Sequence, residues 1–404
     1  MNDGSTIYIP LEIRRNILAY LPHSDLRNTR LVSGTYNELA QSLLFKDIYL
    51  EYDQHSFAKL ASISQHEVLH KHVRTLTYNA ACYRGRNILF KGFEISLLSV
   101  ALRRFSGLKG ITYTCKAKNG TWLQRQRHNC HSSFWALIEA ARPIAPSLVS
   151  FRAFHVSRKN FNQKCQALNE VGGMSFPILQ EFSLSTICIG DEEGSHEHPR
   201  ALTAFLGQTS SSTLRSLEII TLSDSRDRLN AHLLPDLLPK GKDWRALSHI
   251  SLGGVAITPT WFRNLLRSNA DTLHSLELEN IDIQPETNAP LGSFPWVDLL
   301  QFLGSLKLQE IAIRGRLHSK LEGPNIIEVC GPIFLNEDRT PPMENHLTAR
   351  IEAYITRGAE FPLKKPARDD GSHEMRNWVR FGDLTWNHSG SITGPPNAIN
   401  HNEY

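Results

Sequence analysis

The residues with the clearest chemical potential form the pentapeptide HEVLH at residues 66–70. On an α-helix, H-E-x-x-H spacing places two imidazoles one turn apart, where they can share a Zn²⁺ while the glutamate acts as a general base. The third ligand of the extended forms of this motif is absent, and the segment runs directly into a predicted strand at Val73. A zinc-dependent hydrolase that uses His66, Glu67 and His70 is therefore kept only as an alternative hypothesis.

A second group of metal-ligand residue types comprises His128, Cys130 and His131. It has no second pair at the spacing of a structural zinc site, and we predict that it lies in a loop. The sequence contains no G-x-S-x-G, Walker A or G-x-G-x-x-G motif. We predict that the chain is not an enzyme and needs no cofactor or metal.

The elements around these residues begin with an amphipathic stretch at residues 9–50. Pro10 suits a first helical turn, because its missing N–H would have no partner inside the helix. Ile13, Ile17 and Leu21 follow at four-residue steps, so the first predicted helix has an apolar face. These spacings predict that the chain opens with a helix that packs by one side.

Two further short helices are predicted before residue 44. Pro22 ends the first helix, and Ser24 and Asp25 are N-cap candidates for the second. Three helices this short cannot bury all of their aliphatic surface among themselves, and leaving that surface in water costs roughly 25 cal/mol per Å². It must pack on the following domain, on another protein, or on both.

The order of residues 9–33, I-P-x-E-I-x3-I-L-x2-L-P-x2-D-L-x4-L-V-S, resembles the F-box motif in the form common among filamentous-fungal proteins. The similarity continues through Ile48. This resemblance implies binding to a Skp1-like adaptor and, through it, to a cullin-containing SCF-type ubiquitin ligase. The side chains assigned to Skp1 binding are Ile9, Pro10, Ile13, Ile17, Leu18, Leu21, Leu26, Leu31 and Val32. The alternative is that these helices only cap a scaffold without a ligase role.

A second pattern, apolar-x-x-apolar-x-apolar, recurs after the helices at intervals mostly in the thirties. Copies begin at Val73, Leu108, Leu148, Leu179, Leu214, Leu247, Leu273 and Leu308. Apolar residues at helical spacing separate most copies, so each unit is predicted to hold one strand and one helix. Such a unit is similar to a leucine-rich repeat, in a long and irregular form. A doubly wound α/β domain is less consistent with the sequence, because no glycine-rich strand–helix turn is present.

The predicted fold is therefore α/β. A three-helix F-box is followed by an irregular leucine-rich-repeat-like solenoid with parallel strands and with helices on the convex side. The expected domains are a disordered N-terminus at 1–8, the F-box at 9–50, the repeat body at 51–340, a C-terminal cap at 341–386 and a disordered tail at 387–404. The target protein would bind the repeat body at residues that the sequence does not identify.

Composition supports a folded protein outside membranes. Of 404 residues, 41% are hydrophobic and 21% are charged. The net charge of +4 includes no dense Lys/Arg run, so we predict no nucleic-acid partner. No window has the length of a membrane helix, and no signal peptide is expected. The six cysteines form no C-x-x-C, which favours reduced thiols and a cytoplasmic or nuclear location.

Overall fold

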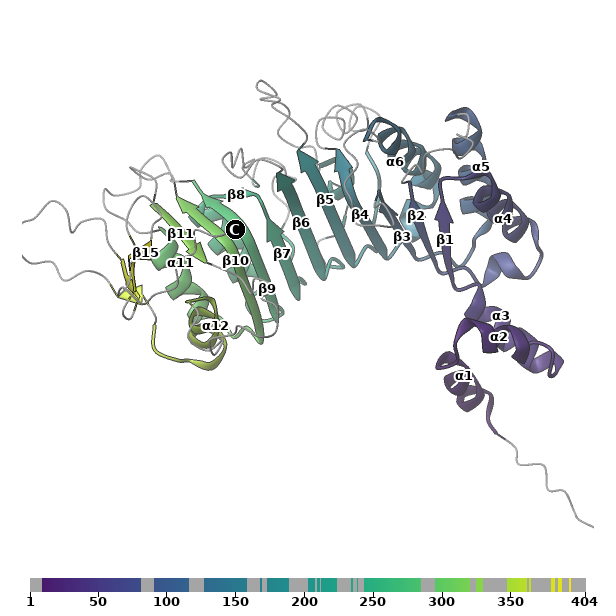
Figure 1. The fold of residues 1–404 in the computed structure, drawn as a ribbon, viewed down its shortest axis with the longest axis horizontal. Coiled ribbons are helices and arrows are strands. Elements are labelled where there is room, and N and C mark those ends of the chain that lie inside the picture. Colours follow the sequence, from purple (N-terminus) through teal and green to yellow (C-terminus); the bar gives the residue numbers. More distant parts are fainter. Residues whose placement is uncertain are drawn as a thin grey trace, which may run out of the picture. The chain divides into compact units, whose positions relative to one another are not determined.

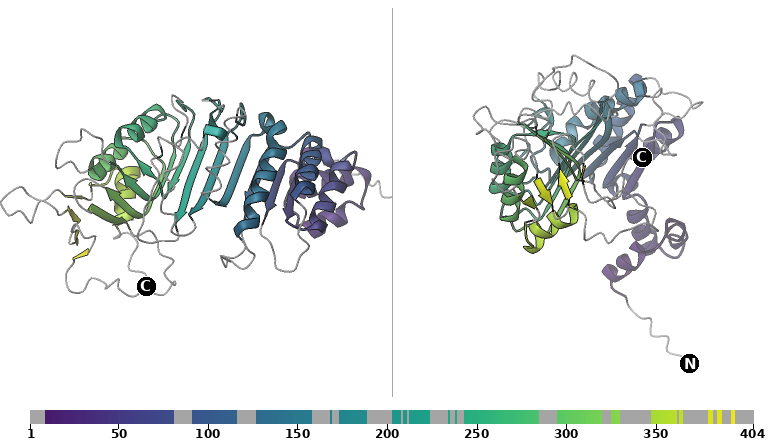
Figure 2. Two further views of the ribbon diagram at one scale, coloured as in Figure 1. Left: turned by 90° about the horizontal axis from the view of Figure 1, so that it is seen from above. Right: turned by 60° about the vertical axis from the view of Figure 1, so that its left-hand side comes forward.

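The protein is seen here as a computed structural model that forms two compact units, Met1–Val156 and Ser157–Tyr404 (Figure 1). Each unit combines parallel strands with helices, which Figure 2 shows from two further sides. The residues that the structure describes, and to which all structural statements below refer, are 9–80, 91–115, 127–157, 168, 173–188, 203–207, 209–210, 212–223, 234, 238, 243–284, 295–319, 325–329, 347–361, 363–364, 379–381, 384–386 and 392–393.

Unit 1 opens with three short helices: α1 (Leu11–Ala19), α2 (His23–Thr29) and α3 (Gly34–Leu44). Pro10 is the N-cap of α1, one position before the predicted one. The predicted caps of α2 are wrong, because Pro22 occupies the N-cap and Ser24 and Asp25 lie within the first turn. Asp25 still stabilises α2, since its negative charge faces the positive end of the helix dipole.

The remainder of unit 1 is a parallel sheet in chain order with helices between its strands. The strands are β1 (Asp47–Glu51), β2 (Thr75–Asn79), β3 (Gly110–Thr114) and β4 (Ser150–Ser157). The helices are α4 (Gln54–Gln65), η1 (Leu69–Lys71), α5 (Lys91–Arg104), α6 (Arg127–Ala141) and η3 (Arg142–Ser147). The predicted domain boundary at residue 50 falls within β1, which pairs with β2.

Unit 2 continues the same design. Strands β5 (Glu181–Cys188), β6 (Ser216–Ser223), β7 (His249–Gly253), β9 (Ser275–Ile283) and β10 (Glu310–Ser319) are parallel neighbours in that order. Strand β8 (Ala256–Ile257) pairs with β9, and β11 (Asn325–Val329) is antiparallel to β10. The helices are α8 (Thr203–Leu206), α10 (Pro259–Ser268), α11 (Pro295–Gly304) and α12 (Leu347–Arg357).

A small antiparallel sheet completes unit 2. Its strands are β12 (Leu363–Lys364), β13 (Val379–Phe381), β14 (Leu384–Trp386) and β15 (Ile392–Thr393). Strand β15 lies inside the segment 387–404, for which the sequence predicts disorder. It pairs with β14, which precedes that segment.

The repeated apolar pattern accounts for the parallel strands. In every copy the three apolar positions are buried, and the second and third lie on the strand. Equivalent positions are in register, as in the row Leu217, Ile250, Leu276 and Ile311. Burying a large aliphatic side chain contributes about 1.5–3 kcal/mol, so the in-register rows form a continuous apolar layer. The predicted parallel strands are thus present in both units.

The turn before each strand fixes this register. The carbonyl oxygen of Arg74 accepts the amides of Lys109 and Gly110, at 2.8 and 3.1 Å. The same geometry recurs in unit 2, where the His274 carbonyl accepts the amides of Gln309 and Glu310 at 2.9 and 3.0 Å. Two successive amides held by one carbonyl align each strand with its neighbour before the ladder begins.

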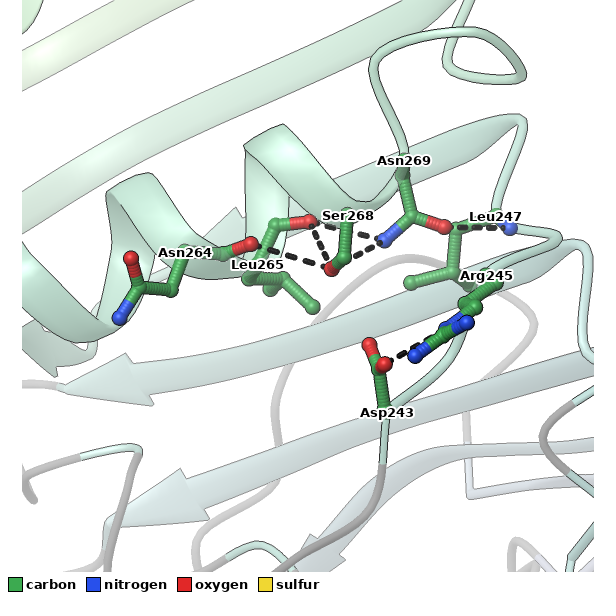
Figure 3. Close-up of polar contacts among 7 residues, drawn as sticks. All are labelled: Asp243, Arg245, Leu247, Asn264, Leu265, Ser268 and Asn269. Atoms are coloured by element: carbon green, nitrogen blue, oxygen red, sulfur yellow. Dashed lines mark hydrogen bonds and ion pairs between the residues drawn. The ribbon is translucent and has the colours of Figure 1, made fainter.

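A buried asparagine links a helix to the sheet in unit 2 (Figure 3). Asn269, the C-cap of α10, accepts the Leu247 amide at 2.9 Å and donates to the Leu265 carbonyl at 2.8 Å. The end of α10 is thereby tied to the turn before β7. Sequence analysis does not single out this residue. The nearest match to the asparagine of a leucine-rich repeat is Asn280, which instead lies within β9 at a positive φ of 52°.

A buried carboxyl group lies between the sheet and helices of unit 1. Glu94 on α5 is 1% exposed, and the Tyr78 hydroxyl of β2 donates to it at 2.5 Å. Burial raises the pKa of Glu94, although hydrogen bonds from Tyr78 and Ser133 partly oppose the shift. Burial, followed by the charge of Glu94, raises the pKa of Tyr78 well above its ordinary value. The fold therefore raises the pH at which Glu94 loses its proton.

We predict that Asn269→Ala lowers the free energy of unfolding by about 2–4 kcal/mol, because the Leu247 amide and the Leu265 carbonyl lose their side-chain partner. Urea denaturation measures the change. Asn264→Ala on the same helix is the control, since the exposed Asn264 side chain serves neither bond, and its cost should stay within about 0.5 kcal/mol. Equal costs for the two variants would contradict the role assigned to Asn269.

Glu94→Gln provides a pH test of the buried carboxyl. A group whose pKa is raised in the folded state stabilises the fold below its unfolded pKa, and this contribution is lost as pH rises through the folded pKa. The melting temperature of Glu94→Gln should therefore rise relative to that of the unmodified protein as pH increases from 4.5, the ordinary pKa, towards neutrality. Thermal melts at matched ionic strength measure the difference. A difference that stays constant with pH would show that Glu94 keeps its ordinary pKa.

Candidate protein-docking surface

The three N-terminal helices share a very small apolar core. It consists of Leu18, Leu26, Leu39 and Ala40, against which Leu21, Tyr36, Leu43 and Leu44 pack as partly buried neighbours. One residue from α1 and one from α2 thus meet two from α3. This core holds the three helices together but covers only one side of α1.

Most of the other aliphatic side chains face solvent. On α1, Ile13 and Ile17 are 49% and 53% exposed, and Leu11 is similarly open. In the link between α2 and α3, Leu31 and Val32 are 86% and 69% exposed. Pro10 is exposed as well, at the start of α1. Exposed aliphatic side chains of this size in one small domain are typical of a protein-binding surface.

The structure separates the residues predicted to bind Skp1 into two groups. Leu18 and Leu26 are 3% and 4% exposed and belong to the core, while Leu21 is half-buried against it. These three therefore hold the helices in place. The side chains that a partner can reach are Ile9, which is half-buried, and the exposed Pro10, Ile13, Ile17, Leu31 and Val32.

Polar contacts that sequence analysis does not identify hold the exposed positions. The Arg14 guanidinium donates to the Ile9 carbonyl at 2.8 Å and lies 5.6 Å from the centre of the Tyr36 ring. It thus ties the start of α1 to α3. Next to Leu31, the Arg30 side chain donates to Asn37 at 3.2 Å. The sequence held one clue to the role of Arg14. It lies on α1 about one turn before both the exposed Ile17 and the buried Leu18.

The alternative zinc site is not built as its motif requires. Helix α4 ends at Gln65, and His66 is its C-cap with extended backbone, ψ 125°. The His66 Nδ1 atom accepts the Val68 amide at 3.2 Å, and the His70 ring contacts the His66 carbonyl at 2.7 Å. Because the helix stops first, the imidazoles of His66 and His70 and the carboxylate of Glu67 do not share a helical face. Val68, inside the motif, is exposed.

Other metal-ligand candidates also differ from expectation. His128, Cys130 and His131 lie in α6 and not in a loop, although their side chains fall outside the described part. Within the part of the chain that the structure describes, no group of three or more His, Cys, Asp or Glu side chains could hold a metal ion. Cys115, at the end of β3, takes part in a disulfide, so the expectation of reduced thiols is wrong at this residue.

Comparison with known families bears on the same helices. Residues 8–48 match the F-box domain. The match covers α1, α2, α3 and the first residues of β1, which are the elements that carry the exposed aliphatic side chains. No curated protein matches the chain. This match supports the identification of the chain as an F-box protein.

Among the helices of the described ranges, none combines the length and the apolar character that a membrane span needs.

Truncation of one core and one surface residue on α1 tests this division. We expect Leu18→Ala to lower the free energy of unfolding of the F-box helices by about 2–5 kcal/mol, because it opens a cavity in a small core. Ile17→Ala, one residue earlier, removes a half-exposed side chain and should cost below about 1 kcal/mol. Circular dichroism during urea titration measures both. If Ile17→Ala is the more destabilising variant, the two residues have been assigned to the wrong sides.

Proposed function

We propose that this chain is a substrate-recognition subunit of an SCF-type ubiquitin ligase. In this proposal the F-box binds a Skp1-like adaptor and, through it, a cullin, while the repeat body holds a target protein. The supporting observation is that the F-box leaves Pro10, Ile13, Ile17, Leu31 and Val32 exposed in the free chain. F-box proteins are generally non-catalytic adaptors, and the proposal assigns this chain the same role.

The proposed role requires no chemistry from this chain. A target lysine held near the ubiquitin thioester of a conjugating enzyme reacts faster, because its effective concentration rises when both are tethered to one assembly. The F-box supplies one tether and the repeat body the other. The zinc-hydrolase alternative loses its geometric basis, since α4 ends before His66.

The body is proposed to be an irregular leucine-rich-repeat-like solenoid, as the recurring strand pattern predicts. Supporting features are the buried apolar rows and the shared carbonyl before each strand. The likeness to fungal F-box proteins and the domain limits 9–50, 51–340 and 341–386 stay predictions. A cytoplasmic or nuclear location is proposed with the ligase role, and the disulfide at Cys115 is unusual for such a compartment.

Charge placed on the exposed F-box surface should weaken adaptor binding. We expect Ile17→Asp combined with Leu31→Asp to weaken binding of purified Skp1 by at least about 30-fold, the loss of roughly 2 kcal/mol typical of an interface hot spot. Isothermal titration calorimetry measures the dissociation constant.

Val100→Asp is the matched control for the Skp1 experiment. Val100 on α5 is 50% exposed, close to the 53% of Ile17, and lies outside the F-box. The control variant should bind Skp1 as the unmodified chain does. Unchanged Skp1 affinity in the F-box variant, or an equal loss in both, would contradict the proposed surface.

A further inference from the structure

The strands of unit 2 have a second face, opposite the one that carries the buried apolar layer. Along each strand the buried motif residues alternate with residues that point to the opposite side of the sheet. Figure 2 shows the helices of this unit gathered on one side of its strands. We call the side opposite the buried motif residues, over β5, β6, β7, β9 and β10, the open face.

The open face carries a concentration of carboxylates. Register places Glu181, Glu218, Glu277, Glu279 and Glu310 on it, all at least partly exposed. Arg314, in the middle of β10, lies in register with Glu279, and His249 lies in the row of Glu181 and Glu310. The whole chain carries a net charge of +4, so this face is opposite in sign to the average of the protein.

Among the described residues, most of this charge has no ion-pair partner. No lysine or arginine there forms an ion pair with Glu218, Glu277, Glu279 or Glu310. Arg314 lies in register beside Glu279, whereas the row that contains Glu218 and Glu277 holds no basic residue. A cationic partner would therefore meet Glu218 and Glu277 without a lysine or arginine in their row.

Serines hold the central row in a defined geometry. In register across the strands lie Ser183, Glu218, Ser251, Glu277 and Ala312. Ser183 donates to Glu218 at 2.5 Å, and Ser251 donates to Glu277 at 3.1 Å. Neighbouring strands are about 4.8 Å apart, so these two carboxylates, separated by two strand spacings, stand roughly 10 Å apart. Each keeps acceptor capacity for a further donor, because an ionised carboxylate accepts about four hydrogen bonds.

An unused hydroxyl lies beside this row. Ser185 is two residues beyond Ser183 on β5, so its side chain points to the same face. The residue is 5% exposed, and its hydroxyl makes no hydrogen bond to another described residue. Its oxygen is not among the fully buried side-chain atoms that lack a partner, so it stays within reach of a molecule that lies on the face.

We propose that the open face of unit 2 binds an extended Lys/Arg-rich segment of a partner protein. The segment would cross the strands, place its cations against Glu218 and Glu277, and bring polar groups towards Ser185. This proposal rests on the proposed function, of which it names the class of target, but the binding itself does not depend on Skp1. A divalent cation is the competing occupant, and it enters the test as an outcome that overturns the proposal.

The test uses the full chain and a fluorescent peptide of four Lys-Gly-Ser repeats, with the Gln-Gly-Ser peptide as a neutral control. Fluorescence anisotropy should show binding of the lysine peptide alone, weakening as salt screens the charges. Glu218→Gln combined with Glu277→Gln should raise its dissociation constant about tenfold, since two ion pairs are lost while glutamine still accepts from each serine. The control pair Glu139→Gln and Glu360→Gln, exposed residues outside the face, should leave it unchanged.

Four results would overturn the proposal. The first two are equal binding of the neutral and lysine peptides, and an equal loss of affinity in the control pair. The other two are binding of Ca²⁺ without binding of the lysine peptide, and no binding of the lysine peptide at all. Skp1 affinity is measured on the same variants. Retained Skp1 binding with no peptide binding rejects only the acidic docking surface, whereas peptide binding without Skp1 binding rejects only the ligase role.

Discussion

Burial of apolar side chains by neighbours, and not within a single element, is the constraint on which this structure depends. One strand with one helix cannot enclose its own aliphatic residues, so each strand of the parallel sheet relies on its neighbours. Leu217, Ile250 and Leu276 show the solution in unit 2, where three strands contribute to one buried row. The shared carbonyls before each strand set that register, and Asn269 fixes a helix end to it.

The N-terminal helices bury only part of their apolar surface. Their core consists of Leu18, Leu26, Leu39 and Ala40, and it leaves Ile17 and its exposed neighbours in water. Arg14 and Ser33 hold the helices that carry these side chains by polar contacts, which need no further apolar burial. The F-box match implies a Skp1-like partner, which would bury the side chains that this domain leaves exposed.

Much of the fold could be predicted from the sequence, because the strand signal repeats. Each copy of the apolar pattern predicted one strand of the sheet, so a weak copy did not affect the strands predicted from the others. Local signals without repetition were less reliable. Ser24 was an acceptable N-cap, yet Pro22 already set the extended backbone before α2. H-E-x-x-H spacing could not reveal that α4 ends at Gln65, before the motif. Spacing also could not show that Leu18 is buried and Ile17 exposed, since both suit an apolar face. The open face was missed because its glutamates are far apart in sequence and are aligned only by strand pairing.

The exposed aliphatic side chains of the F-box are proposed to bind a second polypeptide. Methyl NMR of the isoleucine-labelled chain, recorded during addition of purified Skp1, tests this binding. The methyl signals of Ile13 and Ile17 should shift and saturate, while the signal of Ile178, a partly exposed isoleucine of unit 2, stays in place. Unchanged signals from Ile13 and Ile17 at saturating Skp1 would show that these side chains do not form the adaptor surface.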